Sequence, residues 1–230
     1  MFCFRDRNTV EIAGHCIIKT FIGPDRIQRV ERLENTYRLL IDKKVPHTDS
    51  LFHRYDATVV LRPRGISKPP GTEDELVAAV VCVLEMLEAS SHEEFVNQSL
   101  NLEQVLHQEP PVFHRDLRWP NVVRCLDGQH QWFVIDWEDA SATPTHAQFH
   151  FDHETHSPKS FVDGHGAEVD IWGVGTLISQ CGSLYISEEL RSLGERMRSD
   201  TPPSAQEALN EVKKYSSIKG SNEPSSSKKQ

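Results

Sequence analysis

Residues 114–121 read HRDLRWPN and residues 135–140 read IDWEDA, and these two stretches are the most informative part of the sequence. In the first stretch an aspartate and an asparagine stand five positions apart, and in the second an aspartate directly follows an apolar run. Carboxylate and amide oxygens are ligands that suit a hard cation. Either tripeptide alone would carry little weight, but the order, the spacing and the turn-like segment between the stretches make the joint pattern specific.

The two stretches resemble the catalytic loop H-R-D-x-x-x-x-N of protein kinases and the metal-binding aspartate motif on the strand after it. The resemblance implies ATP and Mg²⁺ as cofactors, because phosphoryl transfer needs cations at the β- and γ-phosphates and a carboxylate that accepts the attacking hydroxyl's proton. It implies that Asp116 is the base and that Asn121 and Asp136 hold the metal ions. Arg118 would bring positive charge to the transferred phosphate.

Residues 169–175, VDIWGVG, resemble the start of the buried helix that anchors a kinase C-lobe, in which Asp170 would brace the backbone of the catalytic loop. Together the three stretches resemble the divergent kinase-like domains of fungi and oomycetes, including the C-terminal domains of Crinkler-type effectors. The resemblance covers roughly residues 19–215 and is strongest over residues 114–178. It implies a protein kinase that transfers the γ-phosphoryl group of ATP to Ser/Thr hydroxyls.

Upstream, Lys19 ends a short I-I-K strand, like the kinase lysine that pairs with the α- and β-phosphates. Glu34 lies on the next predicted helix and would form the lysine–glutamate ion pair, with Glu31 as a competing choice one turn earlier. The segment VVLRPRG that begins at Val59 resembles the strand and hinge that hold adenine. The expected apolar walls for the base are Ile17, Leu61 and Val123.

Three features depart from the protein-kinase pattern. The G-x-G-x-x-G loop is missing before Lys19, where only Gly14 stands, and the strand before it is in doubt as well. Ser157-Pro158-Lys159 stands where A-P-E is expected, with a lysine in place of the acid, and residues 90–110 place extra sequence ahead of the catalytic loop. One alternative is therefore a pseudokinase that acts as a binding module. The other is a small-molecule kinase of the aminoglycoside or choline kinase type, whose I-D-W-E-x-A motif is very similar.

We expect an α+β, bilobal protein-kinase-like fold with a reduced β-rich N-lobe and a mainly helical C-lobe. Residues 1–71 form the N-lobe and hinge, residues 72–215 the C-lobe, and residues 216–230 a disordered tail, because the tail is rich in serine and lysine. The apolar patterns predict strands at 16–18 and 57–61. They predict helices at 27–40, from an N-cap at Thr72, at about 92–107, after Asp170, and as a pair over 187–215 split at 201–203.

The apolar runs 112–113 and 132–135 bracket the turn-like segment LDGQ at 126–129 and predict a hairpin. The following segment holds His146, His150, His153 and His156, with His165 nearby. Such spacing could bind zinc, but solvated loop residues are the better interpretation, because no cysteine accompanies them. Candidate phosphorylation sites, whose added charge could order the loop against Arg115, are Thr143, Thr145, Thr155 and Ser157.

Composition indicates which partners to expect. The 230 residues carry a net charge of −9, and an acidic chain is a poor candidate for nucleic-acid binding. No apolar run is long enough to span a membrane, and the charged N-terminus does not resemble a signal peptide. The five scattered cysteines include no C-x-x-C pair, which is typical of a reducing compartment. We therefore expect an intracellular, cytoplasmic or nuclear monomer that binds ATP and acts on a protein substrate of unknown identity.

Overall fold

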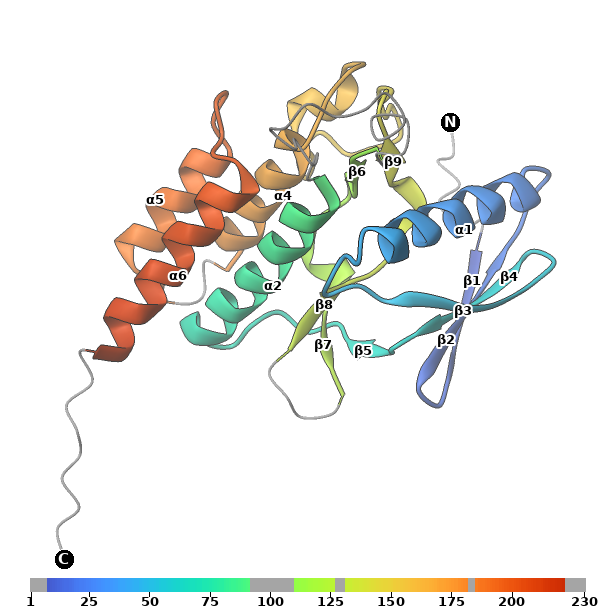
Figure 1. Cartoon of the computed structure of the whole chain (residues 1–230), viewed down its shortest axis with the longest axis horizontal. Coiled ribbons are helices and arrows are strands. Elements are labelled where there is room, and N and C mark those ends of the chain that lie inside the picture. Colours follow the sequence, from blue (N-terminus) through green and yellow to red (C-terminus); the bar gives the residue numbers. More distant parts are fainter. Residues whose placement is uncertain (1–7, 92–109, 127–130, 182–184, 222–230) are drawn as a thin grey trace, which may run out of the picture.

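The computed structural model describes residues 8–91, 110–126, 131–181 and 185–221, with side chains described up to residue 215. The fold is α+β, as predicted: most of the strands lie in the N-terminal part, and the C-terminal part is mainly helical. Figure 1 shows a β-sheet with one helix on one side of the molecule, a group of helices on the other, and short strands between them. One hydrophobic core runs through both parts.

The larger sheet has four antiparallel strands in the order β1-β2-β4-β3. The predicted strand at 16–18 continues to residue 21, so Lys19 lies inside β2 rather than at its end. Because Lys19 pairs with Val59 and Ile17 with Leu61, all four side chains share one face of the sheet. The strands are β1 (Asn8–Ala13), β2 (Cys16–Phe21), β3 (Ser50–Tyr55) and β4 (Thr58–Arg62).

The strand ahead of the lysine, which the sequence left in doubt, is present as β1. Only Gly14 and His15 lie between β1 and β2, and Gly14 takes a left-handed conformation with φ +58°. A glycine tolerates this conformation at no steric cost, which suits a tight hairpin turn. The connection is therefore too short to form a glycine-rich phosphate loop.

Helix α1 (Arg26–Asp42) covers the sheet, in agreement with the predicted helix at 27–40. Its buried side chains recur at the spacing of an amphipathic helix and form one apolar stripe. Figure 1 shows α1 lying across the strands of the four-stranded sheet. The buried residues of α1 are Val30, Leu33, Tyr37 and Leu40.

A short linker joins the two parts of the molecule and belongs to a second sheet. Its strand β5 (Gly65–Ile66) pairs with β7 (Val122–Cys125), which pairs with β8 (Trp132–Val134). At Gly65 the linker runs so close to β7 that a Cβ atom would lie 2.6 Å from Cγ2 of Val123 and 2.9 Å from Cζ of Phe133. Both neighbours are buried, so neither can move freely.

Gly65→Ala is therefore expected to lower the free energy of unfolding by about 1–3 kcal/mol, because the added methyl overpacks the linker against β7. Chemical denaturation measures the change. Gly71→Ala is the matched control, since a Cβ there meets only Glu75 Oε2 at an ordinary 3.5 Å. Equal stability of the two variants would contradict this account of the linker.

The predicted hairpin between residues 112–113 and 132–135 is wrong. Strand β6 (Val112–Phe113) pairs with β9 (Ser141–Ala142), and β8 pairs with β7, which begins directly after Asn121. The apolar runs were correct as strands, but β6 pairs with a segment almost thirty residues away, a pairing that local sequence does not encode, and the hairpin partner of β8 is the strand directly after Asn121. The tip of the actual β7–β8 hairpin, residues 127–130, lies outside the described residues.

The helical part consists of α2 (Glu73–Ser91), α4 (Glu168–Ser179), α5 (Glu188–Met197) and α6 (Ala205–Ser221). The predicted cap at Thr72 is confirmed, because its hydroxyl accepts a hydrogen bond of 3.2 Å from the Glu75 N–H. Helix α6 continues beyond residue 215 into the predicted tail, while the predicted helix at 92–107 and residues 222–230 lie outside the described residues. None of the helices in the described ranges is both long and apolar enough to cross a membrane.

Candidate active site

The loop of residues 114–116 is held by the buried carboxylate of Asp170 on α4. The backbone N–H groups of His114 and Arg115 donate to Asp170 Oδ2 and Oδ1 at 2.8 and 2.6 Å. Arg115 has φ +69°, a conformation that is costly for a non-glycine residue and needs support from its surroundings. Burial raises the pKa of Asp170 above its usual value, although these two N–H groups and nearby positive charge act against the shift. The bracing role expected for Asp170 therefore has a direct structural counterpart.

His114 fixes the loop from its other side. Its Nε2 lies 3.0 Å from the carbonyl oxygen of Ile135, and its Nδ1 accepts a hydrogen bond of 3.2 Å from the Asp116 N–H. The imidazole ring is fully buried and packs edge-to-face on Trp137, with centroids 4.7 Å apart. The segment that carries Asp136 is thereby joined to the loop that carries Asp116.

Both oxygens of the Asp116 carboxylate have partners. Oδ2 accepts a hydrogen bond of 2.9 Å from Asn121 Nδ2, and Oδ1 lies 2.9 Å from Arg118 Nε, out of line for a hydrogen bond. Burial alone would raise the pKa of Asp116, but a hydrogen bond from His156 and the charge of Arg118 leave it below its usual value. The carboxylate is therefore ionised at neutral pH and able to accept a proton.

His156 is a site residue that the sequence did not reveal. Its Nε2 lies 2.8 Å from Asp116 Oδ1, and its Nδ1 lies 3.0 Å from the carbonyl oxygen of Asp152. The ring is buried and stacks on Phe151, with centroids 4.2 Å apart. The prediction of solvated histidines is wrong for His156, and also for His165, which is 4% exposed.

The zinc alternative finds no support in the described residues. His146 and His150 pair with Asp163 and Asp139, and His153 stacks on Phe161, so the rings point to separate partners. Within residues 8–91, 110–126, 131–181 and 185–215, no group of three or more His, Cys, Asp or Glu side chains could hold a metal ion.

Two of the predicted phosphorylation sites have buried hydroxyls with internal partners. Thr145 donates to the carbonyl oxygen of His165, and the Ser157 hydroxyl accepts from the Lys159 N–H and caps the short turn Pro158–Phe161. Arg115 binds this segment already, because its Nε donates to the Asp139 carbonyl at 2.7 Å and its Nη1 to that of His146 at 3.3 Å. The segment is thus attached to the loop without added phosphate.

Lys19 lies among acidic side chains of the second motif. Its Nζ is 2.8 Å from Asp136 Oδ1 and 2.8 Å from Glu138 Oε2. Asp136 has φ +66° and precedes a 3₁₀ turn, Trp137–Asp139, which brings the two acids to one side while Trp137 is buried in the core. Burial alone would lower the pKa of Lys19, but the two carboxylates outweigh it and leave the pKa above its usual value.

The predicted ion pair between Lys19 and Glu34 is not formed. Glu34 Oε2 accepts a hydrogen bond of 2.5 Å from Arg54 Nη1 on β3, and the competing Glu31 lies 3.9 Å from Arg54 Nη2. The rotation of α1 explains this difference. Val30, Leu33 and Tyr37 take the face turned to the core, so Glu34 is directed toward β3 and away from Lys19.

The side of α1 near Lys19 supplies a cation instead. Arg29 Nε donates to Glu138 Oε1 at 2.8 Å, and Arg29 Nη2 forms a close contact with the same carboxylate. Asn8 on β1 donates to Glu138 Oε2 at 3.0 Å and accepts from Arg29 Nη2 at 2.8 Å. Burial alone would raise the pKa of Glu138, but Lys19 and Arg29 hold it below its usual value.

The predicted adenine walls are only partly brought together. Ile17 and Leu61 are direct partners on β2 and β4, on the face that also carries Lys19. Val123 is buried on β7, under the linker at Gly65. Ile17 and Leu61 are thus neighbours in the four-stranded sheet, while Val123 belongs to the second sheet.

A buried tyrosine and aspartate lie behind the site. Tyr37 on α1 donates a hydrogen bond of 2.8 Å to Asp49 Oδ1, and both residues are almost completely buried. Burial raises the pKa of Asp49 to about 7, and the charge of Asp136 adds to the shift, while the Tyr37 hydroxyl and Lys19 oppose it. The sequence offered no sign of this pair, because neither residue belongs to a motif.

Asp49→Asn is therefore expected to change how stability depends on pH. The folded pKa of Asp49 lies above its unfolded value of 3.8, so the wild type loses stability as pH rises between about 4 and 7. Asparagine does not titrate, so the variant does not share this loss. Between pH 5 and 8 its free energy of unfolding should therefore increase relative to that of the wild type by about 2 kcal/mol. Denaturation curves at both pH values measure this, and a constant difference would contradict it. Asp42→Asn, on the exposed end of α1, is the control.

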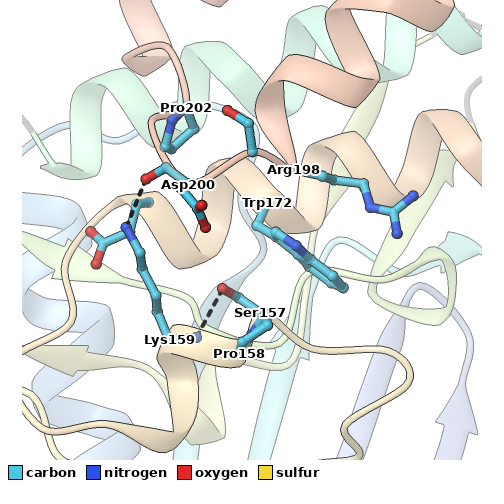
Figure 2. A pocket seen from close by; sticks show the side chains of 9 residues that line it. Ser157, Pro158, Lys159, Trp172, Arg198, Asp200 and Pro202 are labelled. Carbon is cyan, nitrogen blue, oxygen red and sulfur yellow. Dashed lines mark hydrogen bonds between the residues drawn. The ribbon is translucent and has the colours of Figure 1, made fainter.

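Lys159, which replaces the expected acid, forms a hydrogen bond with the segment that connects α5 to α6. Its Nζ donates a hydrogen bond of 3.1 Å to the Asp200 carbonyl oxygen between α5 and α6 (Figure 2). Beside it lies Trp172 of α4, whose ring is 5.3 Å from the guanidinium carbon of Arg198. The position that carries an acid in protein kinases thus still joins the segment to the helices, through the opposite charge and a backbone acceptor.

The donor set of this site suits Mg²⁺. Asn121 commits its amide nitrogen to Asp116, which leaves its amide oxygen as the atom for a cation, and the Asp136 side chain is 38% exposed. The segments that carry the two residues are hydrogen-bonded, because the Ile135 N–H donates to the Asn121 carbonyl at 3.0 Å. Mg²⁺ is usually held by one or two protein oxygens together with phosphates and water rather than by an all-protein cage.

No protein-family model matches the chain. Crinkler effector protein 8 of Phytophthora infestans is 32% identical to it over 167 residues, which are 68% of this chain and 25% of that protein. The chain therefore spans about a quarter of the length of this relative. The match supports a Crinkler-like relationship.

Proposed function

We propose that this protein is an ATP-dependent kinase of the protein-kinase-like superfamily, which transfers the γ-phosphoryl group to Ser/Thr hydroxyls of a protein. One observation carries the proposal: a continuous set of contacts runs from Lys19 to Asp136, through the adjacent Ile135 to Asn121, and on to Asp116. These four side chains provide the cation, the metal ligands and the base that this reaction needs. The resemblance of the motifs to Crinkler-type kinase domains points to the same superfamily, and the chain is similar to a Crinkler effector protein.

In the proposed reaction Asp116 accepts the proton of the attacking hydroxyl. Asn121 holds the Asp116 carboxylate in place through Oδ2, and Arg118 provides positive charge beside Oδ1. Lys19, on strand β2, binds the phosphates of ATP. Mg²⁺, held by Asn121 and Asp136, would neutralise charge that develops on the phosphate oxygens. The hydroxyl must displace the His156 ring or share Oδ1 with it, because His156 Nε2 occupies that oxygen.

The test is transfer of labelled phosphate. Purified protein incubated with [γ-³²P]ATP and Mg²⁺ should label itself or a mixture of serine- and threonine-containing peptides. Acid hydrolysis should then yield phosphoserine or phosphothreonine, and chelation of the metal should stop the reaction. Labelling no higher than a protein-free blank, at millimolar ATP and across a panel of peptides, would refute the proposal.

A second candidate is a pseudokinase that serves as a binding module. The two-residue turn between β1 and β2 favours it, since this turn offers few backbone N–H groups to clamp a phosphate. A thermal melt distinguishes the two, because a ligand that binds the folded state raises the melting temperature. A rise with Mg²⁺ and ATP favours the kinase. An unchanged melting temperature at millimolar nucleotide favours the binding module.

A third candidate is a small-molecule kinase. Lys159 favours it, because its contact with Asp200 replaces the acidic anchor that accompanies peptide docking in protein kinases. This candidate predicts phosphate transfer to amino sugars or amino alcohols and none to peptides. A panel of such metabolites, assayed by ATP consumption, decides between the two kinase classes.

A further inference from the structure

Glu138 lies between two basic side chains of the site. It contacts Lys19 through Oε2 at 2.8 Å and Arg29 through Oε1 at 2.8 Å. Asn8 donates to Oε2 and bonds to Arg29, so the carboxylate is held from β1, β2 and α1 together. Its side chain is 20% exposed, against 38% for Asp136. The Glu138 carboxylate is therefore held in place by contacts with both the sheet and helix α1.

The two cations on Glu138 are arranged around one aromatic ring. Lys19 Nζ lies 5.3 Å and Arg29 Cζ lies 4.9 Å from the ring centroid of Phe21, which is 1% exposed. Cations within about 6 Å of a ring centroid are attracted by its face. Phe21 and Glu138 thus restrict Lys19 and Arg29 to defined positions. Two positive and two negative side chains (Lys19, Arg29, Asp136 and Glu138) make the cluster electrically balanced.

The two acids that contact Lys19 have different freedom to act. Asp136 is the more exposed, and in the proposed reaction its carboxylate is needed for Mg²⁺. Glu138 is bound from behind by Arg29 and Asn8, so it can stay on Lys19 when Asp136 turns to a metal ion. The glutamate expected on α1 is engaged with Arg54 instead. Of the two described carboxylates that contact Lys19, Glu138 is then the one that can keep it in place throughout the reaction.

We propose that Glu138, fixed by Arg29 of α1, is the positioning residue that orients Lys19 toward the phosphates. The role toward the phosphates rests on the proposed kinase function, whereas the contacts between Glu138, Lys19 and Arg29 do not depend on it. The arrangement differs from the predicted one, in which helix α1 would supply the glutamate for Lys19. Here the helix supplies an arginine, and the segment after Asp136 supplies the glutamate. Lys19 is consequently oriented by the same segment that carries the metal ligand.

The reactivity of the Lys19 amine tests this proposal without any need for kinase activity. Only the unprotonated amine reacts with acetic anhydride, and Glu138 favours the protonated form. In Glu138→Gln, labelling of the Lys19 peptide at pH 8–9, measured by mass spectrometry, should rise about tenfold, because loss of the carboxylate removes one of the groups that raise the pKa of Lys19. Glu34→Gln, which removes a carboxylate of the same kind from α1, should label at the wild-type rate.

Glu138→Asp controls for a general loosening of the fold, because it keeps the charge. Its labelling should stay closer to wild type than that of Glu138→Gln, with both variants melting cooperatively. Equal labelling of the wild type and Glu138→Gln, or an equal rise in Glu34→Gln, would overturn the proposal. If Glu138→Gln does not fold, a folded Glu138→Asp variant decides the question. Labelling of its Lys19 peptide at the wild-type rate supports the proposal, and a tenfold higher rate refutes it.

Nucleotide binding separates this inference from the proposed function. If the wild type binds ATP with Mg²⁺, Glu138→Gln should raise KM for ATP about tenfold and change kcat much less, since the lost interaction serves binding of the phosphates. A fall in kcat alone would contradict the assigned role. If the wild type binds no nucleotide, the proposed function fails, while the labelling of Lys19 still decides whether Glu138 orients it.

Discussion

Asp116→Asn is expected to lower the rate of phosphoryl transfer by about 10²–10⁴-fold, the usual contribution of a general base. Asparagine has nearly the same shape and keeps one oxygen as a hydrogen-bond acceptor, but it cannot take up the proton of the attacking hydroxyl. Because Asp116 is not assigned to the phosphates or to the metal ion, the affinity for ATP should stay close to that of the wild type. The measurement is the initial rate of ³²P transfer at saturating ATP, with nucleotide affinity determined in parallel.

The matched control is Asp163→Asn, which removes an exposed carboxylate from the loop that also carries His156. It should transfer phosphate at close to the wild-type rate. Full activity in Asp116→Asn would remove Asp116 from its role as the base. Loss of ATP binding in the same variant would instead indicate a role in holding the nucleotide.

Asp170→Ala is expected to have the largest effect on stability, a loss of about 3–5 kcal/mol in the free energy of unfolding. Asp170 is 1% exposed and accepts the backbone N–H groups of His114 and Arg115. Alanine leaves both donors buried without a partner, each at a cost of about 1–3 kcal/mol. The raised pKa of Asp170 means that burying its charge already costs stability, which offsets part of the loss.

Chemical denaturation of Asp170→Ala, Asp170→Asn and Glu168→Gln measures this expectation. Asp170→Asn keeps one acceptor and should lie between alanine and the wild type. Glu168→Gln, two positions earlier on α4, should change the free energy of unfolding by less than about 1 kcal/mol, because it bonds only to the nearby Gly166 N–H. A change of similar size in all three variants would show that α4, rather than the two bonds of Asp170, supports the loop.

The predictable parts of this structure are those with a local signal. The apolar spacing of α1 gave its bounds to within a few residues, and Thr72 marked the start of α2. The 114–121 motif brought Asp116 and Asn121 within hydrogen-bond distance because its spacing is short. Strand pairing was harder to predict, since β6 joins the distant β9, while the local partner of β8 is β7 rather than the apolar run at 112–113.

The partner of Lys19 could not be derived from spacing alone. The buried stripe on α1 shows how Glu34 is oriented within the helix, but not how the helix is turned relative to β2. Glu138 does carry a signal, because it is the second acid in the IDWEDA motif and lies two residues after Asp136. His156 and Asp49 carry no such signal, and only the tertiary fold brings them close to Asp116 and Tyr37.

The segment after α1 has a consequence for how this chain folds during its synthesis. Residues 47–49 add to the edge of β8: Val134 donates to the His47 carbonyl at 2.8 Å, and the Asp49 N–H donates to that of Val134 at 3.2 Å. His47 also contacts Glu85 on α2, which contacts Lys213 near the C-terminus at 2.7 Å. These contacts cannot form while the C-terminal half is still in the ribosome. Residues 47–49 therefore gain these hydrogen bonds only after β8 has been synthesised, and such distant pairings slow folding.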